Sequence, residues 1–176
     1  VCETLNGELS LQITYPVGGY LYASLVEGNI LVSEVGYGER QAFRIQTITK
    51  HLKEIIVYAT HIFYDLKDNL IADSYPQNKD GTDALKYILG HTQFEHHFLA
   101  DSNISKVTTA RIVRKNVVEA LIGDEDNSFI NRWGGEILRN NYAITMLEKR
   151  GTKSGMKIMY AKNLTGVEFK IDRTTI

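Results

Sequence analysis

The sequence predicts an α+β protein in which two β-rich units, barrel-like or antiparallel, are joined by short helices. Two changes of pattern predict this class. Apolar and polar residues alternate roughly by twos through the first part of the chain, as they do in half-buried strands. The spacing becomes helical after residue 80, and the alternation returns after residue 135. We therefore expect a β-rich unit over residues 1–75 and an α+β unit over residues 76–176.

The first unit is expected to contain about four strands. Alternating, β-branched and aromatic residues place these strands at 8–15, 29–35, 42–50 and 54–66. Short segments at 38–41 and 51–53 are predicted to be turns between them.

Short helices are predicted at the start of the second unit. Asp80 caps the first helix, Gly90 ends it, and its apolar side chains recur at helical spacing: Ala84, Leu85, Ile88 and Leu89. Asn116 and Glu119 form a capping-box pattern at the start of the second. Segment 105–116, between the two helices, is predicted to be a strand.

The chain's single tryptophan, Trp133, lies beside Arg132 in a short predicted helix that Gly134 ends. One interpretation is an exposed aromatic anchor with an arginine that binds an anion. The other is a structural corner, in which Trp133 packs with Phe129 on the buried face of the helix. The shared face favours the corner, so we expect Phe129, Arg132, Trp133 and Gly134 to have structural roles.

An antiparallel meander is predicted to follow this corner. Its alternating segments lie at 136–139, 142–149, 156–162 and 167–172. Asn140 and Asn141 are the expected two-residue turn of the first hairpin.

The composition is that of an ordinary globular protein. Apolar residues make up 43% and charged residues 23%, with a formal net charge of −1, so neither a nucleic acid nor an anionic membrane is indicated as an obligatory partner. The single cysteine, Cys2, fits folding in a reducing cytoplasm. The apolar runs are far shorter than the roughly 20 residues that span a bilayer, so we expect no membrane-spanning segment.

A metal site is the first chemistry to consider, because His91, Glu95, His96 and His97 lie within seven residues. A zinc-binding helix needs two histidines four residues apart, whereas His91 and His96 are five apart. Glu95, His96 and His97 also lie in a predicted strand, where neighbouring side chains point to opposite faces. We expect no metal site and no cofactor.

Catalytic patterns are also weak. No glycine-flanked serine elbow occurs, and the acidic clusters at 65–68 and 124–126 lie in predicted connections rather than across a cleft. We therefore expect no catalytic residues in this sequence.

Several motifs point to one family. The second half contains a short helix pair, an "RWGGE" element, an "RG" pair and "YAKNLTG", and the first half adds segments 5–16, 41–50 and 57–69. These features resemble the N-terminal region of siphophage and prophage tail proteins of the tail-associated lysin, or prophage endopeptidase tail, family. Asn140 stands where the family pattern has aspartate. The matching residues are Phe129, Arg132, Trp133, Gly134, Gly135, Glu136, Arg139, Asn141, Arg150, Gly151, Tyr160, Lys162, Asn163, Leu164, Thr165 and Gly166.

The resemblance implies a baseplate-hub protein of the tail tip. Such proteins combine barrel-like and smaller α+β domains, and three copies form a ring that continues and closes the tail tube. The implied partners are two further copies, other tail proteins such as the distal tail protein and the tape measure protein, and phage DNA in transit through the lumen. Peptidase or muralytic activity belongs, in this family, to C-terminal domains, so none is expected here. The implied location is the virion tail, after synthesis in the bacterial host cytoplasm.

Two alternatives remain open from the sequence. One is a cell-wall peptidase or hydrolase, which needs a bound metal or a set of catalytic side chains that meet only in space. The other is a receptor-binding or cell-wall-carbohydrate-binding module, for which Tyr15, Tyr20, Tyr22 and Tyr37 are candidate exposed aromatics.

Overall fold

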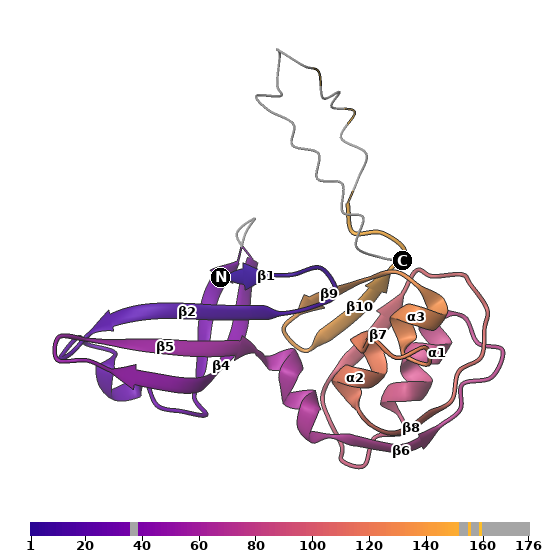
Figure 1. The fold of residues 1–176 in the computed structure, drawn as a ribbon, viewed down its shortest axis with the longest axis horizontal. Helices are drawn as coiled ribbons and strands as arrows, with labels where there is room; N and C mark the ends of the chain where they lie inside the picture. The colour runs from indigo at the N-terminus through magenta and orange to yellow at the C-terminus, as the bar shows by residue number, and fades with distance from the viewer. Residues whose placement is uncertain (36–38, 152–154, 156–158, 160–176) are drawn as a thin grey trace, which may run out of the picture.

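The computed structural model describes residues 1–35, 39–151, 155 and 159 of the chain. The fold is α+β, as predicted, with a sheet at one end and a body of sheet and helices at the other (Figure 1). Expected segments 156–162 and 167–172 lie outside the described residues, apart from Met159. No helix in the described part of the chain is both long and apolar enough to cross a membrane.

The first sheet has five strands in the order β1-β2-β5-β4-β3, and every neighbouring pair is antiparallel. It does not close into a barrel, because β1 and β3 remain its two edges. Of the two forms that we expected for this unit, barrel-like or antiparallel, the structure has the antiparallel one, as an open sheet. The strands are β1 (Cys2–Glu3), β2 (Leu9–Pro16), β3 (Ile30–Val35), β4 (Glu39–Lys50) and β5 (Glu54–His61), with a one-turn 3₁₀ helix, η1 (Tyr22–Ser24), between β2 and β3.

Alternation in β5 decides which face of this sheet is buried. Ile55, Val57, Ala59 and His61 are buried, while the residues between them are partly exposed. Leu25, from the connection after η1, completes the apolar cluster on that face. The predicted turn at 38–41 is wrong in part, since residues 39–41 belong to β4 and pair with β3.

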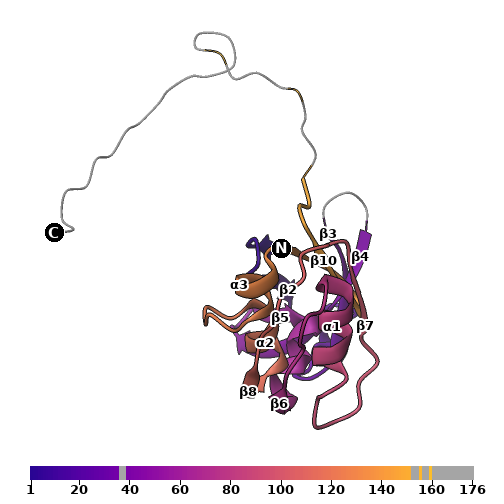
Figure 2. The ribbon, with the colours of Figure 1, turned by 90° about the vertical axis from the view of Figure 1, so that its right-hand side faces the viewer.

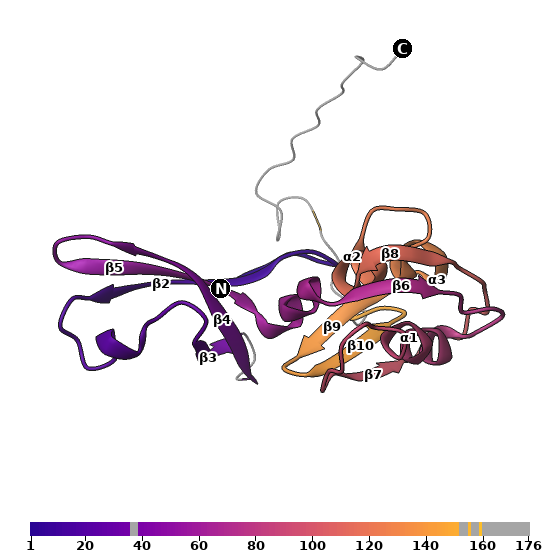
Figure 3. The ribbon, with the colours of Figure 1, turned by 90° about the horizontal axis from the view of Figure 1, so that it is seen from below.

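The segment after β5 differs from its prediction. The strand expected to reach residue 66 ends at His61, and η2 (Ile62–Asp68), a 3₁₀ helix, follows. Its residues Ile62, Phe63 and Leu66 are buried at helical spacing. The apolar residues that suggested a strand are therefore buried by a helical turn instead. The helix η2 connects the first sheet to the second body (Figure 3).

Within residues 70–151, the second body contains three helices and two small sheets. β10 pairs antiparallel with β9, as the first hairpin of the predicted meander requires, and parallel with β7, a strand from outside that meander. The parallel pairing arises because β7 arrives from a distant segment, after α1. The elements are β6 (Leu70–Ser74), α1 (Gly81–Leu89), β7 (Leu99–Ser102), β8 (Ile112–Asn116), α2 (Val117–Ile122), α3 (Phe129–Trp133), β9 (Glu136–Asn140) and β10 (Ala143–Leu147).

The helix caps follow the sequence closely. The carboxylate of Asp80 accepts the N–H of Asp83 at α1, and the Asn116 amide oxygen accepts the N–H of Glu119 at α2. The strand expected over 105–116 is shorter, because only β8 forms a ladder, with β6, and Thr108 makes an isolated bridge to Lys79. The strand expected around residues 95–97 is also displaced, since β7 begins at Leu99.

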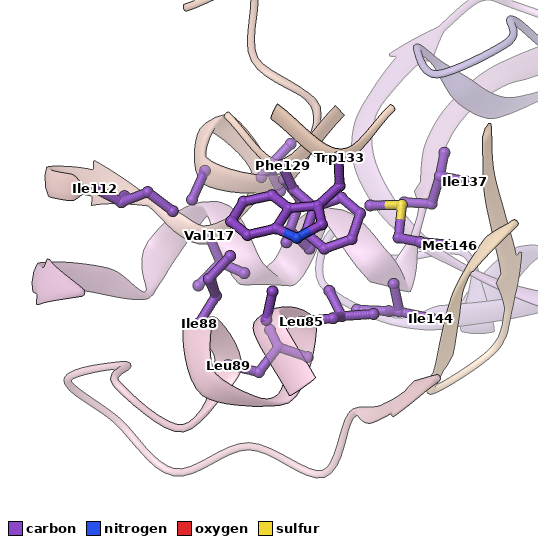
Figure 4. Close-up of a cluster of buried hydrophobic side chains, with 14 of the residues drawn as sticks. Leu85, Ile88, Leu89, Ile112, Val117, Phe129, Trp133, Ile137, Ile144 and Met146 are labelled. Atoms are coloured by element: carbon purple, nitrogen blue, oxygen red, sulfur yellow. The ribbon is translucent and has the colours of Figure 1, made fainter. Parts of the chain in front are cut away.

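The main core lies between the helices and the three-stranded sheet. Trp133 and Phe129 of α3 occupy its centre, with Leu85 and Ile88 of α1 near them and Met146 of β10 to one side (Figure 4). Figure 2 looks onto this body and shows all three helices together. The corner predicted from Trp133 is therefore part of the largest apolar cluster described.

Candidate functional site: a polar junction between the sheets

A network of polar side chains connects the first sheet to β9 and β10. In Figure 1 the loop between β1 and β2 extends across to β9, which brings the two ends of the molecule together. We call this region the junction. It comprises Glu3, Asn6, Gly7, Gln41, His61, Tyr64, Arg139, Asn140, Asn141 and Arg150.

Asn6 takes the place of a neighbouring strand at the edge of β9. Its Nδ2 donates to the carbonyl oxygen of Gly135 at 3.0 Å, and its Oδ1 accepts the N–H of Ile137 at 2.8 Å. One residue of an adjacent strand makes the same kind of bonds through its own N–H and C=O. The edge of β9 is thereby satisfied by the loop of the other sheet.

Asn141 makes the matching contact in the opposite direction. Its Oδ1 accepts the N–H of Ala42 at 2.9 Å, and its Nδ2 donates to the carbonyl oxygen of Arg40 at 3.0 Å. The pairing of β4 with β5 begins at Phe43. Residues 39–42 of β4 pair with β3 on one side, and no strand that the structure describes pairs with them on the other. Two asparagines thus link the sheets reciprocally.

The position of Asn141 corrects the predicted turn. Asn140 pairs with Ala143, so the two loop residues are Asn141 and Tyr142 rather than Asn140 and Asn141. Asn141 has a φ of 49°, a left-handed conformation that asparagine tolerates better than most residues. The residue in the left-handed conformation is therefore the one whose side-chain amide bonds to β4.

Arg139, on β9, is the buried charge of the junction. Its side chain is 0% exposed, and its Nη1 donates to the carbonyl oxygen of Gly7 at 2.6 Å and to the Tyr64 hydroxyl at 3.0 Å. Nη2 lies 3.8 Å from Glu3 Oε1, and among the described residues Nε and Nη2 have no hydrogen-bond partner. Burial lowers the pKa of Arg139, while Tyr64 and Glu3 act in the opposite direction.

The second arginine of the junction secures the end of β10. Arg150 donates from Nη1 to Glu3 Oε1 at 2.6 Å, and its backbone N–H donates to Glu136 Oε2 at 2.7 Å. Glu3 therefore lies between two arginines, which is a favourable arrangement for a partly buried carboxylate.

His61 connects β5 to the junction through Gln41. Its Nδ1 accepts the N–H of Phe63, so Nε2 carries the proton and donates to Gln41 Oε1 at 3.1 Å. Gln41 also accepts the N–H of Asn141 and donates to Asn140. Burial, with Arg139 nearby, lowers the pKa of His61 from 6.5 to about 4, so the ring is neutral at pH 7.

The predicted corner lies directly before the junction. Trp133 is 2% exposed, stacks on Phe129 with ring centroids 5.1 Å apart, and donates from Nε1 to the carbonyl oxygen of Lys79 at 2.9 Å. The exposed-anchor interpretation of Trp133 is wrong. Arg132 is exposed and donates to Asn127 Oδ1 at 2.9 Å, so it has a local structural partner.

Gly135 permits the close approach of β9 and β10. Its φ is 94°, and an added Cβ would lie 2.6 Å from both the Leu147 carbonyl oxygen and Ile104 Cδ1. Any side chain at this position would push the two strands apart. The adjacent Gly134, with a φ of 85°, has nothing within 4 Å of an added Cβ.

The histidine cluster that suggested a metal has structural partners. His91 stacks on Tyr87 with ring centroids 4.1 Å apart, and both ring nitrogens of His96 contact backbone groups, of Leu89 and Phe98. Within the ranges that the structure describes, no group of three or more His, Cys, Asp and Glu side chains could hold a metal ion.

A cavity of about 480 Å³ lies between β8 and α2, but its cations are already paired. Lys115 contacts Glu125, and Arg111 forms a two-bond ion pair with Asp73. The Ser128 hydroxyl, at the start of α3, is buried and makes no cap hydrogen bond.

Of the three described tyrosines that suggested a carbohydrate-binding face, only Tyr20 is fully exposed. Tyr15 and Tyr22 pack against the apolar cluster of the first sheet, and the Tyr15 hydroxyl accepts the N–H of Leu21. Tyr20 is 96% exposed, and Tyr37 lies outside the described residues.

Comparison with known proteins gives one informative likeness. None of the protein-family models or curated proteins compared with the sequence matches it. The fold is similar to that in the crystal structure of prophage tail protein gp18 from Listeria monocytogenes EGD-e, at 1.70 Å resolution. The TM-score is 0.70 with 18% sequence identity, over 93% of this chain and 48% of that chain. The two proteins share a fold. This chain spans about half the length of that protein.

The junction contains many of the residues on which the family resemblance rested. Gly135, Glu136, Arg139, Asn141 and Arg150 all make contacts there. Their partners Glu3, Asn6, Gln41 and His61 had no predicted role. Asn6, Gln41 and His61 lie in segments that carried the resemblance, but only the contacts in the junction identify what they do.

Proposed function

We propose that this chain is a structural component of a phage or prophage tail tip. In this proposal it belongs to a baseplate hub that continues and closes the tail tube, in the N-terminal region of a tail-associated lysin. The fold likeness to a prophage tail protein is the observation that carries the proposal.

The junction supports a mechanical role. Its asparagine, glutamine and arginine side chains are used on backbone groups and side chains of the chain itself, which fixes one sheet against the other. A protein of the tube wall needs such fixed geometry, because errors in the angle between its parts accumulate around a ring. We propose no catalytic, cofactor-binding or metal-binding residues for this sequence.

The proposed partners follow from the same role. The chain would act as a homotrimer in contact with other tail proteins, including the distal tail protein and the tape measure protein, and phage DNA would pass through the lumen only transiently. It would be made in the bacterial host cytoplasm and act in the virion tail. In each copy we propose units at 1–75 and 76–176, with β6 at the end of the first unit pairing with β8 of the second.

Light scattering across a concentration series tests the assembly. We expect the mass of three copies and, in electron micrographs, a ring with a central opening. A monomer at every concentration, for both this chain and a longer chain that contains it, would argue against the ring. Antibody labelling of intact particles tests the location independently, since label on the capsid alone contradicts a tail-tip role.

A digestion assay distinguishes the enzymatic alternative. Purified peptidoglycan incubated with this chain should release no soluble fragments, with and without added zinc. Measurable release would show that a catalytic site forms in this sequence.

A further inference from the structure

The dipeptide Asn6–Gly7 places a reactive asparagine at the centre of the junction. It is the only asparagine in the sequence that is followed by glycine. We propose that Asn6 is a site of spontaneous deamidation, which the folded junction holds back and which releases the β9 edge when it occurs.

The chemistry requires no enzyme. The backbone nitrogen of Gly7 loses its proton and attacks Cγ of Asn6, so a C–N bond forms and the side-chain nitrogen leaves as ammonia. Water then opens the five-membered succinimide to give aspartate or isoaspartate. One water is consumed and one ammonia released. Glycine accelerates the step because no side chain shields its nitrogen.

The folded structure opposes each part of this reaction. Asn6 Nδ2 is bound to the Gly135 carbonyl, and Oδ1 is bound to the Ile137 N–H. The Gly7 N–H itself donates to the Thr4 carbonyl oxygen at 3.0 Å. The amide cannot rotate toward the Gly7 nitrogen while these three bonds persist. Deamidation should therefore proceed from a locally opened state, at a rate set by its population.

The product cannot restore the pairing with β9. A carboxylate at position 6 has no donor for the Gly135 carbonyl, so two acceptors would face each other there. Isoaspartate also inserts a carbon into the backbone next to Gly7. Since the Gly7 carbonyl accepts from Arg139 and Tyr64, both contacts would be disturbed.

Asn141 provides a matched control inside the same molecule. It makes the same pair of backbone bonds, to β4, but Tyr142 follows it and shields the attacking nitrogen. Both asparagines are held by the fold, and only Asn6 has a glycine neighbour.

The test compares the full chain, folded and in denaturant, at neutral pH, with peptide mass mapping at both asparagines. In denaturant we expect Asn6 to convert at least about tenfold faster than Asn141. In the folded chain we expect Asn6 to convert roughly 10- to 100-fold more slowly than it does in denaturant. Equal rates at Asn6 in both conditions would overturn the protection. Equal rates at Asn6 and Asn141 in denaturant would overturn the assignment of the site.

Asn6→Asp reproduces one product and tests the consequence. Hydrogen exchange at the Ile137 amide should become about tenfold faster or more, whereas exchange in α1 should match the parent chain. Unchanged exchange at Ile137 would show that the reaction does not release β9. Faster exchange in both places would show general loss of the fold rather than release of one edge, and would also contradict the proposal.

Discussion

Trp133 is the residue on which the core of the α+β body depends most directly. Trp133→Ala removes a ring that is 2% exposed, its stack on Phe129 and its bond to Lys79. We expect a loss of about 3–5 kcal/mol in the free energy of unfolding, measured by urea denaturation. Trp133→Phe keeps the stack and should cost less. A loss below about 1 kcal/mol for the alanine variant would contradict the buried role.

The two neighbouring glycines separate backbone strain from crowding. Gly134→Ala adds only the cost of a positive φ, about 1–2 kcal/mol, because nothing lies within 4 Å of the added Cβ. Gly135→Ala adds a clash 2.6 Å from the Leu147 carbonyl, and we expect a total of about 3–4 kcal/mol. Calorimetric unfolding measures both, and equal losses would show that β9 and β10 can separate without penalty.

His61 makes stability depend on pH. Its pKa is about 4 in the folded chain against 6.5 ordinarily, so between these values the unfolded chain binds a proton that the folded chain does not. Stability from this group should be constant above pH 6.5 and fall as the pH drops toward 4, by on the order of 3 kcal/mol in total.

Urea unfolding across this pH range measures the effect, and nuclear magnetic resonance titration measures the pKa itself. His61→Asn supplies the control, because its Oδ1 can accept the Phe63 N–H but does not titrate. That variant should lose this part of the pH dependence. A folded-state pKa near 6.5 would contradict the burial argument.

At the scale of elements, two helix starts differ although both have a good capping residue. The Asp80 side chain accepts the Asp83 N–H, whereas Ser128 makes no cap bond at α3. Asp80→Ala should therefore cost about 1 kcal/mol and Ser128→Ala much less. Chemical denaturation of the two variants, side by side, tests this difference. A larger loss for Ser128→Ala would show that its hydroxyl caps α3 in solution.

The predictions of helices and strands are confirmed where the capping residues and the apolar pattern of the sequence agree with the observed burial. The helices at Asp80 and Asn116 begin at residues whose side chains cap them, and the alternation of β5 matches its buried face. The prediction was wrong at 62–66, because β-branched and aromatic residues fit a buried 3₁₀ turn as well as a strand. It also missed the parallel pairing of β7, which no local pattern signals.

For the whole molecule, Arg139 is the strongest test of whether the two sheets unfold together. Arg139→Ala removes a fully buried charge that bonds Gly7 and Tyr64, and we expect it to cost about 3–5 kcal/mol. Fluorescence of Trp133 reports the α+β body alone, while far-ultraviolet circular dichroism reports all strands and helices. The two midpoints should coincide in the parent chain and separate in the variant.

Arg132→Ala is the matched control for that experiment. Arg132 is exposed, and its guanidinium donates to Asn127 within the same loop and helix. The two midpoints should remain coincident in this variant. Coincident midpoints in Arg139→Ala as well would show that the sheets are coupled by contacts other than the buried arginine.

The sequence by itself determined the α+β class, the caps of α1 and α2, and the buried corner at Trp133, because these depend on residues close together in the chain. Only the tertiary structure decided that the first sheet stays open and that Asn6 and Asn141 substitute for strands. Contacts between residues about 100 or more positions apart, such as Asn6 with Ile137 and Ala42 with Asn141, leave no periodic trace in the sequence. They arise only when burial brings two unsatisfied backbone edges together and side-chain amides are present to satisfy them.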